Sequence, residues 1–260
     1  TEELKEILRI LQEEDCTHMV LGNGSNVLVR DGGYRGVIVK LGHGFDQVSV
    51  DGETLRCGSG ALLSAAAKTA ADAGLAGMEC LSGIPGSIGG AVFMNAGAYG
   101  GEIKDVLRKV TVISADGARV FDMDAQKLEL GYRQSLLQKT GDIVLEAEFA
   151  LQPGDETTIK ETMADLKAKR NAKQPVNYPS AGSFFKRPEG YFAGKLVQDA
   201  DLKGVSVGGA EVSQLHSGFL INKGGATATD ILQLMKIVQA TVMDRFGVML
   251  EPEVRIIGEE

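Results

Sequence analysis

The sequence predicts an α+β protein in which a larger N-terminal region of mixed strands is followed by a smaller C-terminal region. Apolar residues recur at helical spacing near both ends of the chain, and short apolar runs bounded by turn residues recur between them. The pair Pro153-Gly154 follows the last N-terminal strand and marks the expected junction. We therefore expect domains over residues 1–152 and 153–260, because 260 residues with 43% hydrophobic side chains can bury two cores.

The first domain is expected to alternate helices with short strands. Leu4, Ile7, Leu8 and Leu11 follow spacings of three and four, which predicts an amphipathic helix over residues 2–14. An alanine-rich helix is expected over residues 61–73, and Gly74 suits its C-terminal cap. Strands are expected over residues 17–21, 27–29, 36–41, 46–50, 54–57, 107–114, 118–122 and 143–151.

The second domain is expected to carry three helices. The first is capped by Asp155 or Thr157 and runs to about Asn171, and the last runs from Thr229, as the N-cap, to Phe246. A shorter helix is expected near residues 191–200. Strands are expected near residues 205–208, 218–222 and 253–257.

Composition excludes several classes of function. The formal net charge is -8, from 27 Lys+Arg against 35 Asp+Glu, which argues against non-specific nucleic-acid binding but allows a local cationic pocket. Three cysteines without paired spacing indicate neither a disulfide framework nor a zinc site, and no metal is expected. No apolar run reaches the roughly 18 residues that span a bilayer. We therefore expect a reduced, cytoplasmic protein that does not bind membranes.

The 34 glycines are clustered, which suggests backbone that approaches a ligand closely or forms tight turns. One cluster lies in Leu21-Gly-Asn-Gly-Ser-Asn-Val-Leu28, which lacks the third glycine and following helix of the dinucleotide fingerprint. Successive backbone N–H groups of such a turn can bind an anion, with Ser25 and Asn26 as further donors. A plain hairpin turn is the alternative at this loop.

The second cluster lies in residues 81–101, where apolar residues are interleaved with glycine throughout. A disordered linker would not carry Ile84, Ile88, Val92 and Phe93, so a packed loop with a short helix against a large flat ligand is expected. A purely structural segment is the alternative.

These two segments resemble the FAD-binding domain of the vanillyl-alcohol-oxidase (PCMH) type, which is shared with the UDP-N-acetylenolpyruvoylglucosamine reductase (MurB) family. The resemblance implies a two-subdomain α+β fold that binds FAD without a Rossmann motif, followed by a substrate-binding domain. Residues 22–26 would bind the pyrophosphate, and residues 83–99 would follow the ribityl chain and flavin. The implied FAD contacts are Leu21, Gly22, Asn23, Gly24, Ser25, Asn26, Val27, Ser82, Gly83, Ile84, Gly86, Ser87, Gly89, Gly90, Asn95, Gly97, Ala98 and Tyr99.

Three further motifs stand at residues 131–135, 179–188 and 252–257. Taken alone, Arg133 could be a surface residue, and the alternating strand that carries Glu253 and Arg255 could be a solvated face. Ser183 lies between Gly182 and two phenylalanines with no histidine nearby in sequence, so an acyl-transfer triad is not indicated.

Together the three motifs are similar to those of the reductase family, in its compact second subtype. The resemblance assigns the activated arginine to Arg133, the proton-donating serine to Ser183 and the acidic residue to Glu253, with Glu251 as a rival. Family members begin with a Thr-x-x-x-x-Gly-Gly segment before the first helix, whereas this chain starts inside that helix. An N-terminal strand segment is therefore expected to be missing from domain 1–152.

The resemblance implies NADPH-dependent reduction of UDP-N-acetylglucosamine enolpyruvate to UDP-N-acetylmuramate through FAD, in peptidoglycan precursor synthesis, by a monomer. Ser183 would need a cationic or hydrogen-bonded neighbour such as Lys186, because a hydroxyl is a weak acid. His216 could equally be a satisfied buried histidine, and Lys173 a solvated lysine. The implied substrate contacts are Tyr132, Arg170, Lys173, Arg187, His216 and Arg255.

Two other functions remain open at this point. An FAD-dependent alcohol oxidase of the same fold would have reduced flavin that reacts quickly with O₂, and it would not need Arg133 and Glu253 together. A non-catalytic module that binds flavin or a nucleotide sugar would bind its ligand without NADPH-dependent bleaching of the flavin.

Overall fold

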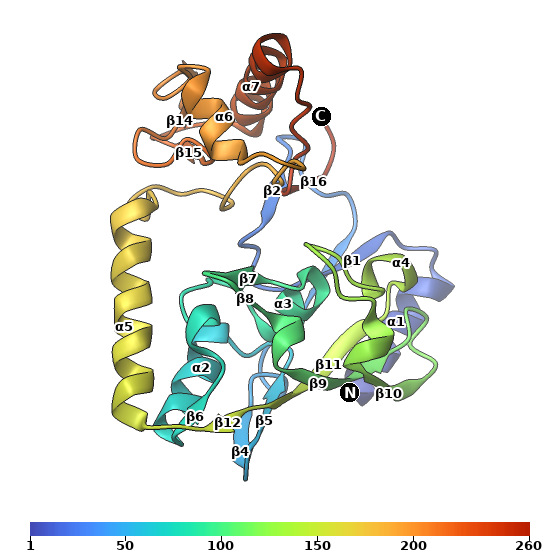
Figure 1. The fold of residues 1–260 in the computed structure, drawn as a ribbon. Helices are drawn as coiled ribbons and strands as arrows, with labels where there is room; N and C mark the ends of the chain where they lie inside the picture. Colours follow the sequence, from blue (N-terminus) through green and yellow to red (C-terminus); the bar gives the residue numbers. More distant parts are fainter. The chain divides into compact units, whose positions relative to one another are not determined.

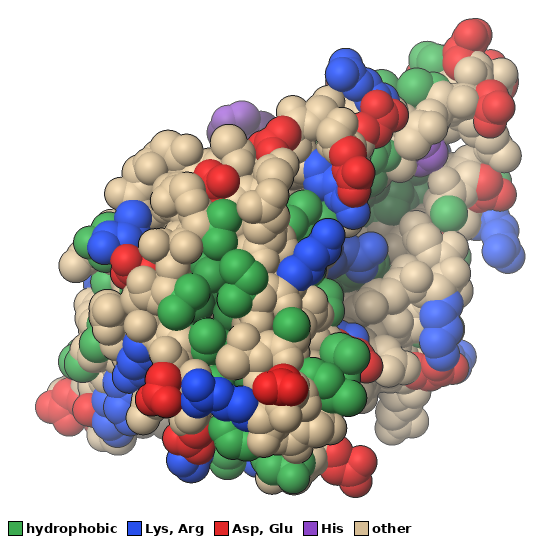
Figure 2. All heavy atoms as spheres, turned by 90° about the horizontal axis from the view of Figure 1, so that it is seen from above, with side chains coloured by type: hydrophobic (Ala, Val, Ile, Leu, Met, Phe, Trp, Pro, Cys, Tyr) green, Lys and Arg blue, Asp and Glu red, His purple; other side chains and the backbone are tan.

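The computed structural model describes residues 1–260, which form two compact units (Figure 1). The first unit contains residues 1–23 and 36–168, and the second contains residues 24–35 and 169–260. No helix is both long and apolar enough to cross a membrane. Acidic and basic side chains are interspersed over the face shown in Figure 2.

The first unit is built on a five-stranded antiparallel sheet with strand order β10-β9-β11-β5-β4. A separate parallel pair joins β1 (His18–Leu21) to β3 (Val37–Lys40). These strands confirm the predicted short strands to within two or three residues at each end. The sheet strands are β4 (Val48–Asp51), β5 (Thr54–Gly58), β9 (Leu107–Ile113), β10 (Val120–Asp124) and β11 (Ile143–Ala150).

The helix α1 (Glu2–Glu13) confirms the predicted amphipathic helix. Leu4, Leu8 and Leu11 are buried in one cluster with Ile113 and Leu145 of the sheet. Three and four residues separate these leucines, which places them on one face of the helix. Burial of that stripe holds the helix, since short helices are marginal in isolation.

The helices α2 (Leu63–Asp72) and α3 (Ile88–Met94) contribute to the main core of the first unit. Ala66, Ala67 and Ala70 of α2 are fully buried with Leu55 and Phe149 of the sheet. Their small side chains allow the helix axis to approach the sheet closely. Gly74 takes the left-handed φ of +67° directly after the cap residue Ala73, close to the predicted end of the helix.

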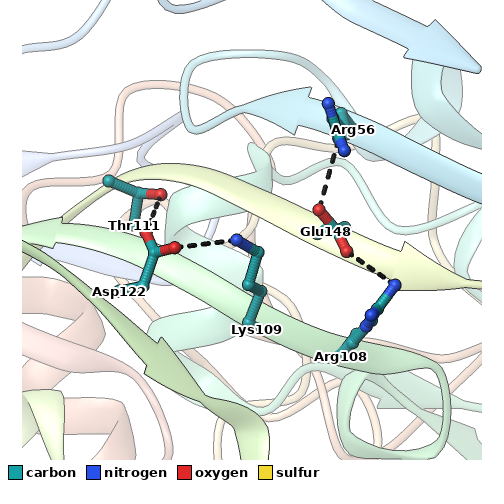
Figure 3. A network of polar contacts seen from close by, with 6 residues as sticks. All are labelled: Arg56, Arg108, Lys109, Thr111, Asp122 and Glu148. Carbon is teal, nitrogen blue, oxygen red and sulfur yellow. Dashed lines mark hydrogen bonds and ion pairs between the residues drawn. The ribbon is translucent and has the colours of Figure 1, made fainter. Parts of the chain in front are cut away.

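The opposite face of this sheet carries a polar network (Figure 3). Strand alternation turns Glu148 away from the core that holds Ala147 and Phe149. Its carboxylate lies 3.2 Å from Nε of Arg56 and 3.1 Å from Nη1 of Arg108. The Glu148 side chain is 6% exposed, so two arginines from neighbouring strands cover a buried acid.

Beside it, Asp122 joins the next pair of strands in the same network. Its carboxylate accepts hydrogen bonds from Nζ of Lys109 and Oγ1 of Thr111, each at 2.7 Å (Figure 3). These two bonds hold the pKa of Asp122 below its usual range. Unlike Glu148, this carboxylate is half exposed.

Short elements connect the parts of the first unit. The antiparallel pairs are β6 (Leu75–Ala76) with β12 (Gln152–Pro153), and β7 (Gly97–Ala98) with β8 (Gly101–Glu102). The short helices are η1 (Glu79–Leu81), η2 (Ile103–Asp105), η3 (Ala125–Leu128) and α4 (Leu137–Thr140).

The long helix α5 (Glu156–Lys173) begins in the first unit, so the division differs from the one expected at Pro153-Gly154. Asp155 caps it as predicted, accepting from the Thr158 N–H at 2.8 Å. Met163 packs against the first core, and Lys160 pairs with Asp72 of α2 at 2.7 Å. These contacts hold the helix to the first unit as far as residue 168.

The second unit has its own core, built from α6 (Ala193–Asp199), α7 (Ala228–Phe246) and a three-stranded antiparallel sheet. The sheet strands are β13 (Ser206–Val207), β14 (Ala210–Val212) and β15 (Leu220–Asn222). A parallel pair joins β2 (Val27–Val29) to β16 (Arg255–Ile257), with Arg255 opposite Val27. This pairing places residues 24–35 in the second unit, although they belong to the predicted first domain.

The predicted N-cap of α7 was wrong by two residues. Thr227 is the N-cap, and its hydroxyl accepts from the Asp230 N–H at 3.0 Å. The Thr229 hydroxyl instead donates to Asp31, whose carboxylate also accepts from the N–H groups of Ala228 and Thr229 at 2.7 and 2.8 Å. A carboxylate from far back in the chain thus occupies this helix N-terminus.

Candidate functional site

The first glycine loop leaves β1 and contacts the second glycine-rich segment. A Cβ on Gly22 would lie 2.5 Å from Oγ of Ser87 and 3.7 Å from Cα of Gly90, so only glycine fits there without a shift. Asn23 donates from Nδ2 to the carbonyl of Pro85 at 2.8 Å. The structure therefore brings residues 22–23 and 85–90 together.

The predicted serines of this segment make local hydrogen bonds. Ser87 is the N-cap of α3, and its hydroxyl accepts from the Gly90 N–H at 3.4 Å. Ser82 donates to the carbonyl of Glu79 at 2.7 Å. The N–H groups of Gly86, Ile88 and Gly89 are bound to the carbonyls of Ile84, Ala61 and Ser59. The Ser87 hydroxyl only accepts in its bond with Gly90, so it keeps a proton that it can donate to an anion.

A tight hairpin follows α3, formed by β7 and β8. A Cβ on Gly97 would lie 2.6 Å from the Gly101 carbonyl oxygen, whereas a Cβ on Gly100 would have nothing within 4 Å. Tyr99 stands at the turn with a φ of +53° and is 43% exposed. The hairpin is therefore packed at its base and open at its tip, where an aromatic ring is presented.

The Asn95 side chain, predicted as a cofactor contact, makes three hydrogen bonds within the first unit. The residue is fully buried, with a left-handed φ of 42° at the end of α3. Its Nδ2 donates to Glu102 at 3.0 Å and to the Gly131 carbonyl at 2.9 Å, and its Oδ1 accepts from the Lys104 N–H at 3.0 Å. All of its polar atoms are used, so it positions backbone.

The loop that carries Arg133 is fastened to the end of α3 by three side chains. Besides Asn95, Ser135 and Gln138 both donate to the carbonyl of Phe93, at 2.7 and 2.8 Å. Gln138 also donates to the carbonyl of Arg133 at 3.1 Å. These bonds fix a backbone in which Arg133 has a φ of +54°, a conformation that is rare for residues other than glycine.

The Arg133 guanidinium lies beside the hairpin β7–β8. Its Nη2 donates to the carbonyl of Gly97 at 3.2 Å, and its Cζ lies 5.0 Å from the ring centroid of Tyr132. A pocket of about 410 Å³ opens here, and its lining carries charges of both signs. The lining residues are Gly97, Ala98, Gly100, Gly101, Glu102, Lys104, Asp105, Tyr132 and Arg133.

Glu102, together with Asp105, supplies negative charge in this pocket. Its carboxylate pairs with Lys104 at 2.8 Å and accepts from Asn95. The hydrogen bond from Lys104 is the largest cause that holds the pKa of Glu102 low, and the charge of Arg133 adds to it. Sequence reasoning missed Glu102 because one glutamate after a glycine pair carries no signal of its own.

In the second unit, the peptide of Phe184 links the candidates Ser183 and Glu253. The Phe184 N–H donates to the Gly218 carbonyl and its carbonyl accepts from the Glu253 N–H, both at 2.8 Å. Phe184 itself is 1% exposed and anchors this backbone in the core. Ser183 and Glu253 therefore stand on neighbouring segments of the second unit, whereas Arg133 belongs to the first unit.

Lys186 and Glu251 continue the contact between these segments. The Lys186 N–H donates to the Glu251 carbonyl at 2.8 Å, and its Nζ lies 3.2 Å from the Glu251 carboxylate. Glu251, the rival for the acidic role, is thus engaged with Lys186. Glu253, two residues further along, donates its N–H to the Phe184 carbonyl.

Asn26, predicted as a pyrophosphate donor, ties the first glycine loop to the acidic segment. Its Nδ2 donates to the Glu253 carbonyl at 3.2 Å, and its own carbonyl accepts from the Arg255 N–H at 3.0 Å. The amide group of Asn26 is therefore used to position Glu253. Ser25, Gly24 and Val27 stand on the same turn and strand, where Gly24 has a φ of +70°.

The other predicted substrate residues are spread over the second unit. Arg187 lies over the ring of Phe192, with its Cζ 3.9 Å from the centroid, and its Nε donates to the Tyr191 carbonyl at 3.3 Å. Arg170 donates to Gln174 at 3.3 Å near the end of α5, whose last residue, Lys173, is exposed. Arg255 is exposed on β16.

His216 lies next to Ser183 through Gly218. Its Nδ1 accepts from the Gly218 N–H at 3.1 Å, and its ring stands edge-on to Phe219 with centroids 4.9 Å apart. Burial lowers the pKa of His216, which favours the neutral ring. Sequence reasoning missed Gly218, since the need for glycine there depends on two side chains that only the fold brings together.

Comparison with known proteins gives similarity over the whole chain. Residues 174–257 match the model of the C-terminal domain of UDP-N-acetylenolpyruvoylglucosamine reductase, and residues 1–121 match an FAD-binding domain model. Curated proteins named UDP-N-acetylenolpyruvoylglucosamine reductase from Clostridium novyi and Exiguobacterium sibiricum are 53% and 52% identical over 259 residues, which covers 100% of this chain and 84% of each relative.

A solved structure is also similar. The crystal structure of UDP-N-acetylenolpyruvylglucosamine reductase from Thermus caldophilus matches 98% of this chain and 88% of its own chain, at 37% identity and a TM-score of 0.84.

Proposed function

Because the chain belongs to the UDP-N-acetylenolpyruvoylglucosamine reductase family, we propose that Arg133, Ser183 and Glu253 act together in its reaction. The chain is an FAD-containing, NADPH-dependent oxidoreductase that reduces UDP-N-acetylglucosamine enolpyruvate to UDP-N-acetylmuramate for peptidoglycan precursor synthesis. Family membership favours this function over an alcohol oxidase or a non-catalytic flavin module. We assign cofactor binding chiefly to the first unit and substrate binding to the second.

The residues of the first unit fit FAD. Gly22 and Gly97 are packed so closely that a Cβ would collide with neighbouring groups, while the tip at Gly100 is open. Backbone N–H groups of residues 22–26 and the Ser87 hydroxyl would hold the pyrophosphate, and residues 95–99 would line the flavin. When bound, the flavin supplies hydride transfer from NADPH to the enolpyruvyl double bond.

Arg133 would bind the enolpyruvyl carboxylate and stabilise the negative charge that develops on it. A guanidinium stays cationic at any relevant pH and can bind a carboxylate with two parallel hydrogen bonds. The bonds from Asn95 to Gly131 and from Gln138 to Arg133 fix the loop before substrate arrives. Such preorganised charge stabilisation is the largest single contribution in many enzymes.

Ser183 would donate the proton to the carbon next to the carboxylate, and Glu253 would polarise that carboxylate. The observation that carries this pairing is the Phe184 peptide, which binds the backbones of Gly218 and Glu253 on its two sides at 2.8 Å. Lys186, two residues beyond Phe184, supplies a nearby cation. A proton donor needs such fixed placement to act within hydrogen-bond reach.

The diphosphate of the substrate would be bound by Arg170, Lys173 and Arg187, with His216 and Arg255 as further contacts and Tyr132 near the carboxylate. The stacking of Arg187 on Phe192 at 3.9 Å supports this for Arg187, because the guanidinium is ordered in advance. We also propose that the enzyme acts as a cytoplasmic monomer. Three free cysteines fit a reducing compartment, and sedimentation of the purified holoenzyme tests the monomer.

The Ser183→Ala variant tests the proposed function through the two half-reactions. We expect it to keep FAD and to be reduced by NADPH at the wild-type rate, because Ser183 takes no part in that step. Re-oxidation by the enolpyruvyl substrate should slow by about 10²–10⁴-fold, the usual effect of losing a placed proton donor. Stopped-flow absorbance of the flavin measures both steps.

Ser206→Ala is the matched control, since Ser206 is an exposed serine of the same unit. It should leave both half-reactions unchanged. Re-oxidation of Ser183→Ala at the wild-type rate would show that another group donates the proton.

A further inference from the structure

Gly218 separates the candidate proton donor, Ser183, from the half-buried His216. A Cβ built on Gly218 would lie 3.3 Å from Oγ of Ser183, and 3.0 and 3.1 Å from Cε1 and Nδ1 of His216. The hydroxyl and the imidazole therefore border the same small space, which exists because residue 218 has no side chain. Contacts of this length are tighter than ordinary packing, so a methyl group could enter only if one neighbour moved.

The backbone of Gly218 does not itself require glycine. Its φ lies outside the left-handed region, unlike that of Gly182, which is +86°. An alanine can adopt the conformation of Gly218 without backbone strain. The effect of alanine at 218 therefore reports on the space beside Ser183.

The imidazole ring of His216 borders that space on the side away from Ser183. Its Nδ1 accepts from the Gly218 N–H at 3.1 Å, so the ring proton stands on Nε2 when the imidazole is neutral. A Cβ on Gly194 would lie 3.3 Å from Cε1 of His216, and Phe219 packs edge-on at 4.9 Å. Gly194 and Phe219 therefore limit movement of the ring away from an added methyl group at 218.

Ser183 is the neighbour that can move. The Ser183 hydroxyl can change position by rotation about χ1 alone. The backbone beside it is held, because the Phe184 N–H donates to the Gly218 carbonyl at 2.8 Å. An alanine at 218 would thus rotate the Ser183 hydroxyl into another rotamer while the backbone stays in place.

We propose that Gly218 and His216 are positioning residues for Ser183. Because Gly218 has no side chain, it leaves the Ser183 hydroxyl in place. The His216 imidazole borders the same space and accepts a hydrogen bond from the Gly218 N–H. This inference rests on the proposed role of Ser183 as proton donor. It assigns a placement role to His216, which the sequence motifs offered as a substrate contact.

The Gly218→Ala variant is the main test, with Gly42→Ala as matched control because a Cβ on Gly42 would have nothing within 4 Å and its φ is ordinary. We expect reduction of the flavin by NADPH to be unchanged in both variants. Re-oxidation by substrate should slow on the order of 10²-fold in Gly218→Ala alone, as expected for a misplaced reacting group. The substrate Kd, measured by titration of the oxidised holoenzyme, should change less than twofold, which separates placement from loss of binding.

A double-mutant cycle isolates the route of the effect. If alanine at 218 acts through the Ser183 hydroxyl, it should slow re-oxidation no further once Ser183→Ala has removed that hydroxyl. Equal slowing in both backgrounds would overturn the inference while leaving the proposed function in place. Failure of Ser183→Ala itself to slow re-oxidation would instead overturn the proposed function.

Two variants of His216 test its positioning role while Gly218 is kept. His216→Asn can keep an acceptor for the Gly218 N–H, whereas His216→Phe keeps a ring but removes the acceptor and leaves that N–H unbonded. We expect re-oxidation to be slowed more by phenylalanine than by asparagine. In the wild-type holoenzyme, ¹⁵N NMR should show Nδ1 of His216 unprotonated at pH 8, and a protonated Nδ1 would overturn the assigned hydrogen bond.

Discussion

The side-chain amide of Asn95 donates a hydrogen bond to the carbonyl oxygen of Gly131 across 2.9 Å, which joins the end of α3 to the loop that carries Arg133. The same side chain binds Glu102 and the Lys104 N–H. One buried residue therefore sets the positions of both sides of the pocket that holds Arg133. This geometry makes the placement of Arg133 depend on a residue that never needs to touch the substrate.

Asn95→Ala should lower the free energy of unfolding by about 2–4 kcal/mol, because it strands buried polar groups and puts alanine at a left-handed φ. It should also slow re-oxidation of the flavin by substrate, since the Gly131 carbonyl, in the loop that carries Arg133, loses its hydrogen-bond donor. Urea unfolding and stopped-flow kinetics measure the two effects. Asn23→Ala, which removes one exposed bond to Pro85, should cost less stability, and an equal cost would contradict the central role of Asn95.

Arg133→Lys should slow re-oxidation by at least about tenfold although the charge is kept, because an ammonium cannot form two parallel bonds to a carboxylate. Lysine also loses the planar stacking on Tyr132. Arg119→Lys is the matched control, since Arg119 lies over the ring of Phe121 at 5.7 Å and has no proposed role in the reaction. Wild-type kinetics in Arg133→Lys would show that charge alone suffices.

Asp31→Asn should lower the urea midpoint at pH 7, because the carboxylate accepts three hydrogen bonds at the start of α7. The bonds from Thr229, followed by that from Ala228, lower the pKa of Asp31 in the folded state. The stabilisation is therefore complete above the unfolded pKa of about 3.9 and is lost as the pH falls through the lower folded value.

The gap in urea midpoint between wild type and Asp31→Asn should thus be constant from pH 7 to about pH 5 and should close below about pH 4. Asp51→Asn, an exposed aspartate on β4, should show no gap at any pH. A gap that widens on acidification would mean that the charge of Asp31 is unfavourable in the folded protein.

Glu148→Ala should lower the free energy of unfolding by about 1–2 kcal/mol, because it leaves Arg56 and Arg108 facing each other without the acid between them. Asp122→Ala, in the same network but half exposed, should cost less than about 1 kcal/mol. Neither variant should alter flavin reduction or re-oxidation. Equal costs would show that the burial of Glu148 adds nothing to its ion pairs.

Local patterns predicted most elements of the fold. Leu4, Leu8 and Leu11 predicted α1 because their spacings of three and four residues place them on one face of a helix, which is buried. The N-cap of α7 was misplaced because the hydroxyl of Thr229 is bound by Asp31, 198 residues earlier in the chain. Sequence neighbours carry no information about a partner at that distance.

For the candidate site, the sequence indicated residue types, and the structure adds the contacts that their side chains make. The motifs indicated Asn95 and Asn26, and the structure adds that their amide groups bind the Gly131 and Glu253 carbonyls. A sequence shows that an amide is present and does not show where it points. Gly218 was missed for the same reason, since its neighbours His216 and Ser183 meet only in the folded unit.

The parallel pairing of β2 with β16 has a consequence for dissecting this protein. An expressed fragment of residues 169–260 would lack β2 and the Asp31 carboxylate. Its strand β16 would then have an unpaired edge, which favours aggregation. A synthetic peptide of residues 24–35 supplied in trans should restore both. The enzyme is thereby suited to a split reporter in which a twelve-residue peptide rescues the folding of a separate polypeptide.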